Sequence, residues 1–178
     1  MTPEAPLTSF ASDNTSGILP EVLSAMNGAN SGAAIGYGDD PYTQKFRQQI
    51  NDLFGHEVTT LLAYGGTGAN IVGLQAMLQP WEAVICTKSS HINVDECAAP
   101  EKFLNAKLID LDSADAKMKP EMLQKELEVL GVVHHAQPGA ISITQSTEYG
   151  TLYSVEELKE LIDTVSYTHL TLPTKRIV

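Results

Sequence analysis

The sequence is short of basic residues and contains no long apolar segment. Lysine and arginine together number 11 against 22 aspartate and glutamate residues, so the formal net charge at pH 7 is −11. Nucleic acid and anionic lipid repel a negative chain, which argues against both as partners. No apolar run approaches the ~18 residues that cross a membrane, and no charged and then apolar leader opens the chain. We therefore expect a cytoplasmic protein that binds neither nucleic acid nor membranes.

Cysteine is scarce as well. The two cysteines, Cys86 and Cys97, belong to neither a Cys-x-x-Cys pair nor a Cys/His cluster. Such spacings are the ones that indicate zinc or redox chemistry. Cys86 lies in an apolar run and Cys97 lies beside small residues, so we interpret both as buried or half-buried thiols. The sequence thus predicts no metal site.

What the sequence does contain is a glycine turn around which the rest is organised. Val58–Ala63 has the pattern of an apolar strand, the turn Gly65–Gly68 follows, and residues 69–78 are expected to form a helix. The first N–H groups of a helix have no backbone partner, and with the helix dipole they attract a phosphate or carboxylate. Thr67 adds a hydroxyl donor. The alternative is a tight turn capped by small residues, because glycine turns between strands and helices are common.

Strand patterns alternate with helix patterns along the rest of the chain. Further apolar strands are expected at residues 83–87, 107–111 and 140–144, and helices at residues 20–27, 41–54, 120–130 and from 154 onward. This alternation predicts an α/β fold with three layers, α/β/α, around a mostly parallel sheet. Such folds bind ligands at the carboxyl ends of their strands. The glycine turn, Ser89–His91 and Gln145–Glu148 all follow predicted strands, so we expect Thr67 and His91 to face a shared cleft.

Two helix starts are marked by capping residues. Asp40 precedes Pro41, which combines an N-cap acceptor with a residue suited to the first helical position. Ser154 and Glu157 match a capping box. Gly55 is expected to end the helix that begins at Pro41.

The last residues differ in character from the rest. Residues 165–178 lack helical periodicity, contain a proline and resemble translated sequencing-adapter DNA. We therefore divide the chain into residues 1–164, the native part, and residues 165–178, a non-native tail. On this interpretation the native reading frame continues past residue 164, and the chain is the front part of a longer protein.

Several short motifs occur together in a characteristic order and spacing. They are Ser12-Asp13-Asn14-Thr15, Tyr37-Gly38-Asp39-Asp40, Gly66-Thr67-Gly68-Ala69-Asn70, His91 with Asp95-Glu96-Cys97, and Glu148-Tyr149-Gly150-Thr151-Leu152-Tyr153. Over residues 9–164 the sequence resembles the low-specificity L-threonine aldolases. These are pyridoxal-phosphate enzymes of the β-eliminating lyase group, with the aminotransferase type I fold. The resemblance implies the N-terminal part of the large, cofactor-binding domain.

The resemblance also implies roles for residues that bind the cofactor. Gly66, Thr67 and Gly68 correspond to the phosphate site, in agreement with the helix-start argument above. His91 corresponds to the catalytic histidine that stacks on the pyridine ring. A lone histidine is more often structural, but the position of His91 after a strand end favours the site.

Four further residues correspond to groups near the substrate. Ser12 resembles a serine that contacts the substrate carboxylate, although a simple turn residue is an equal alternative. Tyr37 corresponds to an active-site tyrosine that reaches across a dimer interface, or else it is a packing aromatic. Glu96 either lies in the site and orients His91 or belongs to a solvated helix face. His134 matches a second catalytic histidine near the substrate hydroxyl, with His135 as the competing alignment.

The chain departs from the family in one respect. The Schiff-base lysine and the Asp-Gly-Ala-Arg motif of the family lie further along the chain, and no lysine before residue 165 has the family's context. We therefore expect a homo-oligomeric threonine aldolase as the parent protein, cleaving L-threonine or L-allo-threonine to glycine and acetaldehyde, and an inactive fragment here. The alternatives are another type I fold lyase or aminotransferase, or a non-catalytic α/β module that binds a phosphorylated ligand.

Overall fold

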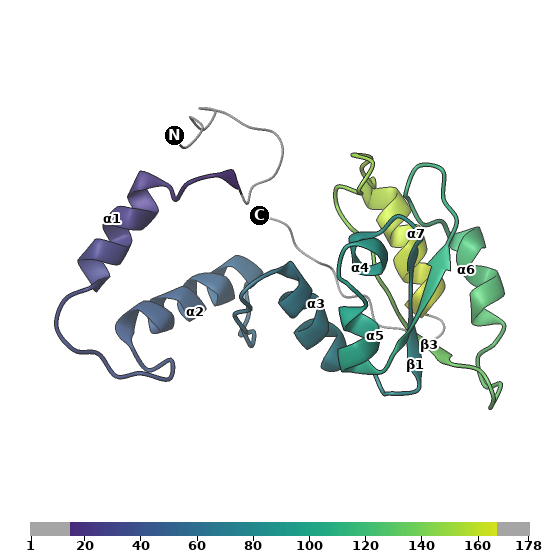
Figure 1. The fold of residues 1–178 in the computed structure, drawn as a ribbon, viewed down its shortest axis with the longest axis horizontal. Helices are drawn as coiled ribbons and strands as arrows, with labels where there is room; N and C mark the ends of the chain where they lie inside the picture. Colours follow the sequence, from purple (N-terminus) through teal and green to yellow (C-terminus); the bar gives the residue numbers. More distant parts are fainter. Residues whose placement is uncertain (1–14, 167–178) are drawn as a thin grey trace, which may run out of the picture. The chain divides into compact units, whose positions relative to one another are not determined.

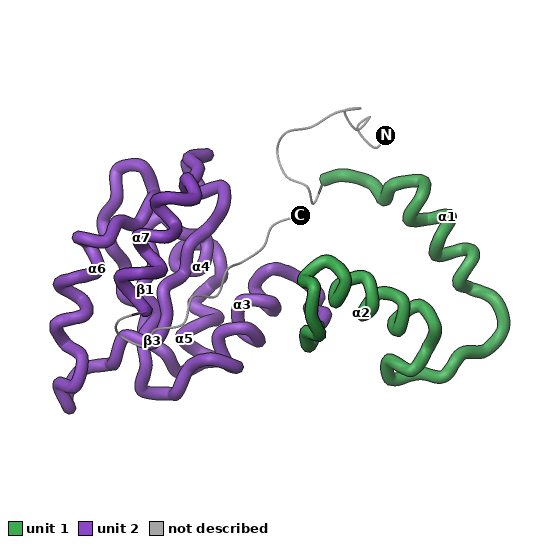
Figure 2. The backbone as a smooth tube through the Cα atoms, turned by 180° about the vertical axis from the view of Figure 1, so that it is seen from behind, with its two compact units in different colours: residues 1–60 green, residues 61–178 purple. Residues whose placement is uncertain are grey.

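The computed structural model describes residues 15–166, which fall into two compact units. The first unit comprises residues 1–60 and the second residues 61–178 (Figure 2). The sequence patterns gave no sign of a division at residue 60. Each unit is described by itself below.

The first unit contains two helices, α1 (Pro20–Ala29) and α2 (Pro41–Phe54) (Figure 1). The predicted start of α2 is confirmed, because Asp40 Oδ1 accepts hydrogen bonds from the N–H groups of Tyr42 at 3.0 Å and Thr43 at 2.8 Å. Its predicted end is confirmed too: Gly55 is the C-cap and has a φ of 72°, a left-handed conformation that favours glycine.

The apolar side chains of the first unit are largely uncovered. Neither helix has a buried residue, and Leu53 remains 75% exposed at the end of α2. The sequence pattern of α2 predicts an apolar stripe that packs on a neighbour. Within residues 15–60 no neighbour covers that stripe.

The second unit is built on a small parallel sheet. Its strands are β1 (Glu82–Thr87), β2 (Lys107–Leu111) and β3 (Gln137–Ile141), in the order β2-β1-β3 (Figure 1). The first two agree with the strands expected at residues 83–87 and 107–111. All pairings are parallel, as predicted.

Strand β3 begins three residues before its predicted start. Gln137 pairs with Glu82 and Pro138 with Ala83, whereas Ala140 pairs with Val84, so Gly139 is an extra residue in the strand. A Pro-Gly pair has little strand propensity, which is why the sequence pattern misplaced the start. A Cβ on Gly139 would lie 2.7 Å from a methyl group of Leu78, so only glycine fits here without a shift of its neighbours.

The predicted strand at Val58–Ala63 is wrong. These residues are irregular and belong to none of the strand pairs of the described chain. Leu61 and Leu62 are 68% and 81% exposed. Strand propensity is realised only when cross-strand and facing neighbours are present, and within the described second unit residues 61–63 have no strand beside them.

Five helices complete the described part of the second unit. They are α3 (Gly66–Gln75), α4 (His91–Val94), α5 (Ala99–Leu104), α6 (Pro120–Leu127) and α7 (Val155–Ser166). Helix α3 starts at Gly66, three residues earlier than predicted, so the glycines form its first turn. The capping box is confirmed before α7, where Glu157 N donates to Ser154 Oγ at 3.1 Å and Ser154 N donates to Glu157 Oε2 at 2.7 Å.

The core lies on both faces of the sheet, which confirms the three-layer arrangement. On one face Ile85 of β1 packs with Leu123 of α6 and Leu161 of α7. On the other face Val84 and Cys86 form a cluster whose other buried members are Leu74, Ile92, Leu104, Ala106 and Ala140. Successive β1 side chains point to opposite faces, and all of them after Glu82 are buried.

The two cysteines differ in their surroundings. Cys86 is buried in β1, as expected, whereas Cys97 is exposed, which corrects the interpretation of both as buried or half-buried thiols. Cys97 lies in the turn between α4 and α5 with a φ of 54°, and its small neighbours do not cover it. Within residues 15–166 no helix combines the length and the apolar character needed to cross a membrane.

Candidate active site

The first element of the site is the N-terminus of α3. Gly65 is the N-cap and has no side chain to occupy the N–H groups that follow. The first hydrogen bond of the helix runs from Ala69 N to Gly65 O at 3.0 Å, so the N–H groups of Gly66, Thr67 and Gly68 precede the helical ladder. Gly68 and Thr67 are half-buried. This turn offers three backbone donors and one hydroxyl, a donor set suited to a phosphate.

The second element is His91, which begins α4 just after β1. The connection is tight: Ser90 is buried and its hydroxyl donates to the carbonyl of Thr87 at 2.7 Å. The side chain of His91 is 47% exposed, and its Nδ1 lies 3.0 Å from Oε1 of Glu96, whose side chain is fully buried. Glu96 therefore contacts the ring of His91 and does not belong to a solvated face.

Asn70 joins these two elements. Its Nδ2 donates to the same Glu96 Oε1 at 2.5 Å. Asn70 lies three residues after Thr67, and residues with that spacing share one face of a helix. The contact Asn70–Glu96–His91 thus links α3, one turn after its donor N–H groups, to the start of α4. Asn70 stands in one of the quoted motifs, but no local pattern identified its partner, which lies 26 residues further along.

Glu148 reaches the same place from the segment after β3. Its Oε1 accepts a hydrogen bond from the N–H of His91 at 2.8 Å, and Thr144 Oγ1 lies 3.3 Å from the same oxygen. The prediction that the segments after two strands meet at one edge of the sheet is therefore borne out for Ser89–His91 and Gln145–Glu148. Glu148 itself was not among the predicted site residues.

The loop that carries Glu148 is anchored on its other side. Thr151 Oγ1 donates to the carbonyl of Asp115 at 2.6 Å, and the hydroxyl of Tyr153 accepts from the N–H of Met118 at 2.6 Å. Gln145 makes two hydrogen bonds with the backbone of Tyr153, at 2.9 and 3.0 Å. The Thr-Leu-Tyr end of the motif thus holds the loop in place, and its glutamate contacts His91.

His134 lies elsewhere. It belongs to the connection that enters β3 at Gln137, and parallel strands enter a sheet at the edge opposite the one where His91 lies. There it lines a hollow of about 310 Å³ with Lys107, at the start of β2, and with His135. The structure therefore does not bring His134 together with His91, and its expected place near the substrate hydroxyl finds no support in this geometry.

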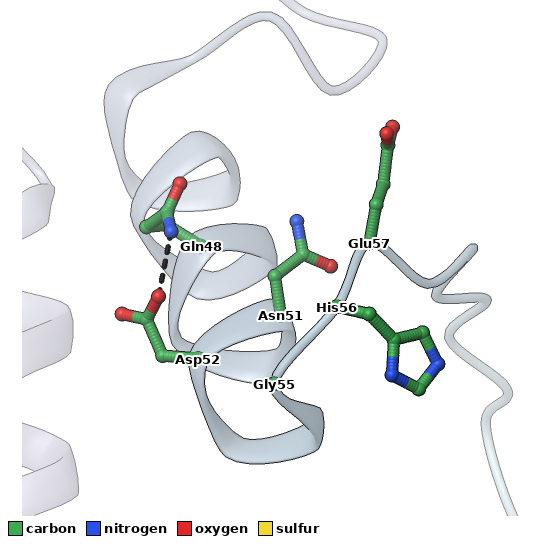
Figure 3. Close-up of a pocket in the computed structure, with 6 residues that line it drawn as sticks. All are labelled: Gln48, Asn51, Asp52, Gly55, His56 and Glu57. Carbon is green, nitrogen blue, oxygen red and sulfur yellow. Dashed lines mark hydrogen bonds between the residues drawn. The ribbon is translucent and has the colours of Figure 1, made fainter.

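The two remaining predicted residues come from the other part of the chain, residues 1–60. Tyr37 belongs to the first unit, is fully exposed and has a φ of 63°. Ser12 lies outside the described residues. The first unit also has a polar hollow of about 470 Å³ at the end of α2, where Gln48 donates to Asp52 at 2.7 Å (Figure 3). Among residues 15–166 no three metal-ligating side chains gather, there or anywhere else.

Comparison with known proteins shows the family to which the chain belongs. The sequence matches the Beta-eliminating lyase family over residues 9–172, and the chain therefore belongs to that family. This match extends past residue 164, into the predicted non-native tail of residues 165–178, so the boundary of that tail stays a prediction.

The more specific relatives share one description. The chain is 37% identical over 164 residues to a low specificity L-threonine aldolase from a Pseudomonas species, and 38% identical over 153 residues to one from Pseudomonas aeruginosa. These alignments cover 92% and 85% of the chain but 47% and 44% of the relatives. The chain thus spans about half the length of the curated relatives it matches.

A solved structure of Leishmania major threonine aldolase has the same fold. It superposes with a TM-score of 0.81 at 28% sequence identity, over 88% of this chain and 46% of that one. The resemblance stated from the motifs is therefore confirmed at the level of sequence and of structure.

Proposed function

We propose that the protein carrying this sequence is a pyridoxal-phosphate-dependent lyase that cleaves threonine or allo-threonine between Cα and Cβ, releasing glycine and acetaldehyde. The observation that carries the proposal is the link between the donor turn of α3 and His91 through Asn70 and Glu96. Through this link, the hydrogen-bond donors at the start of α3 and the imidazole of His91 are connected by side-chain contacts. The identity to two threonine aldolases supports the choice of reaction.

The residues of the donor turn fit the cofactor's phosphate. A dianion needs several donors, and the turn offers the N–H groups of Gly66, Thr67 and Gly68 together with the Thr67 hydroxyl. No side chain stands in the way at Gly68, where a Cβ would meet only the Cβ of Ala63 at 3.8 Å. When bound, the cofactor supplies an electron sink for the bond that breaks at the substrate's Cα.

His91 would lie against the cofactor ring and present one nitrogen to the site. Nδ1 of His91 contacts Glu96 Oε1 at 3.0 Å, which leaves Nε2 as the ring nitrogen outside this contact. Nε2 is then the ring atom available to hold or move a proton. The side chain of His91 is half-exposed, so part of it is accessible to a ligand.

The remaining parts of the proposal concern substrate and assembly. Ser12 contacts the substrate carboxylate, and Tyr37 contributes from a second copy of the chain in a homo-oligomer. The protein acts in the cytoplasm on a small amino acid. The Schiff-base lysine is supplied by another segment of the complete protein, because no lysine before residue 165 has the family's sequence context.

Product analysis tests the reaction. The complete protein is loaded with pyridoxal phosphate and incubated with L-threonine or L-allo-threonine, and glycine and acetaldehyde are quantified. The proposal requires the two products in equal amounts. Formation of 2-oxobutyrate or of another 2-oxo acid from threonine would instead indicate an eliminating lyase or an aminotransferase on the same fold, and would overturn the assignment.

A further inference from the structure

We infer that Asn70 is a positioning residue that sets the orientation of His91 through Glu96, and so couples the donor turn of α3 to the ring that faces the cofactor. The inference rests on the proposed function for its consequence in catalysis. The structural contacts behind it involve only the side chains of Asn70, Glu96 and His91.

The geometry gives one carboxylate oxygen two donors. Glu96 Oε1 lies 2.5 Å from Asn70 Nδ2 and 3.0 Å from His91 Nδ1. A carboxylate oxygen has two lone-pair directions, so an amide donor in one direction leaves the other for the imidazole. The position of the Asn70 amide thereby selects the direction from which the ring of His91 approaches.

The burial of Glu96 limits the number of partners that its carboxylate can have. The side chain of Glu96 is fully buried, while that of His91 is 47% exposed. A buried carboxylate needs hydrogen-bond donors, and Asn70 supplies one that carries no charge and does not titrate. The side chain of His91 is partly exposed, so its contact with buried Glu96 is a restraint on the ring from the protein side.

The lengths of the two helices explain why a separate positioning residue is needed. Helix α4 contains four residues, too few to be stable by itself. Helix α3 contains ten residues and is anchored by buried Leu74. Asn70 therefore connects the short helix α4, through Glu96, to the longer helix α3. It does so one turn after the N–H groups of Gly66–Gly68, so the same helix carries both the donor turn and the residue that contacts Glu96.

The test uses the ring nitrogen signals of His91. In the complete protein labelled with ¹⁵N-histidine, the His91 signals are assigned by their loss in His91→Gln. The Asn70→Ser variant removes the donor to Glu96, and Asn70→Asp replaces it with an acceptor. The matched control is Asn93→Ser, because Asn93 lies in α4 but donates to the backbone carbonyl of Lys88 at 2.9 Å.

The expected result is a change in the Nδ1 and Nε2 shifts of His91 in both Asn70 variants and no change in Asn93→Ser. Unchanged ring signals in a folded Asn70 variant would overturn the inference. If Asn70→Asp does not fold, Asn70→Ser alone decides the matter, since it adds no charge. This readout needs no cofactor, so its failure is distinguishable from failure of the proposed function.

A double-mutant cycle measures the consequence for the cofactor. Asn70→Ser, Glu96→Gln and the double variant are titrated with pyridoxal phosphate and with pyridoxal, which lacks the phosphate. Groups that act through one contact are non-additive, so we expect the double variant to bind about threefold to a hundredfold better than the product of the single effects predicts. An equal loss of affinity for pyridoxal would show that the variants weaken binding of the pyridine ring of the ligand, not of its phosphate. Additive losses would contradict a shared contact.

Discussion

The carboxylate of Glu148 accepts a hydrogen bond from the backbone N–H of His91 at 2.8 Å, across 57 residues of sequence. The start of the short helix α4 is therefore held by a tertiary contact. The loop that carries Glu148 is itself fixed by Thr151 and Tyr153 on the segment around Asp115 and Met118. His91 is thus positioned from two directions, by Glu148 at its backbone and by Glu96 at its ring.

The first prediction concerns the backbone contact. Glu148→Ala removes the acceptor, and we expect the free energy of unfolding to fall by about 0.5–1.5 kcal/mol, the usual net value of one hydrogen bond. Hydrogen exchange at the His91 amide should become faster. Glu148→Gln, which keeps an acceptor oxygen, should exchange at nearly the native rate. If Glu148→Ala leaves His91 exchange unchanged, the contact does not hold α4.

The second prediction concerns the donor turn. Thr67→Val removes the hydroxyl and keeps the shape, so it should weaken binding of pyridoxal phosphate by about 1.5–3 kcal/mol, roughly tenfold to a hundredfold. Thr67→Ser keeps the hydroxyl and should bind like the wild type. The measurement is an absorbance titration of the complete protein. Pyridoxal serves as the second ligand, because without a phosphate it should bind both variants equally well.

Local capping signals predicted both ends of α2 and the start of α7. The Asp40-Pro41 start of α2, its Gly55 end and the Ser154/Glu157 capping box were all found as expected, because each depends on residues at most four apart. Strand β1 was also predicted, since an uninterrupted apolar run is typical of a strand covered on both faces.

Features that depend on distant residues were not predicted. Val58–Ala63 has strand propensity, but pairing requires a neighbour that no local pattern reveals. Pro138 and Gly139 look like a turn, yet Gly139 fits in β3, where a Cβ would lie only 2.9 Å from the Cβ of Glu82. Asn70 and Glu148 gain their roles from partners 26 and 57 residues away. The motifs contained both residues, but only the fold shows what they contact.

The third prediction contrasts the two kinds of apolar side chain. Leu123 is fully buried between α6 and the sheet, whereas Leu62 is 81% exposed. We expect Leu123→Ala to lower the free energy of unfolding of the second unit by about 2–5 kcal/mol, because it leaves a cavity. Leu62→Ala should change it by less than about 0.5 kcal/mol. Urea unfolding followed by circular dichroism measures both. A comparable loss in Leu62→Ala would show that residues 61–63 are covered in solution.

The fourth prediction concerns thiol reactivity. Burial raises the pKa of Cys86 to about 11, so at pH 8 only about one molecule in a thousand carries the reactive thiolate. Cys97 is exposed. An aromatic disulfide reagent should therefore label Cys97 rapidly and Cys86 only after unfolding. The control is Cys97→Ser, in which fast labelling should disappear; fast labelling that persists there would contradict the burial of Cys86.

The fifth prediction concerns acid stability. Hydrogen bonds from the Lys117 ammonium and the Ser154 N–H hold the pKa of Glu157 below its ordinary value of 4.5. A lowered carboxyl pKa stabilises the fold fully above 4.5, and this stabilisation is lost as the pH falls through the folded-state value. Glu157→Gln should therefore flatten the decline of unfolding free energy below pH 4.5. Glu160→Gln, an exposed substitution on the same helix, should leave the decline intact; equal effects would remove Glu157 from this role.

The central claim is that the first turn of α3 and His91 form one cofactor site. A crystal structure of the complete protein with pyridoxal phosphate tests this most directly. The account predicts phosphate oxygens within about 2.7–3.2 Å of the N–H groups of Gly66, Thr67 and Gly68, with the pyridine ring lying against the imidazole of His91. A cofactor whose phosphate binds at another helix or loop, with this turn open to solvent, would contradict it.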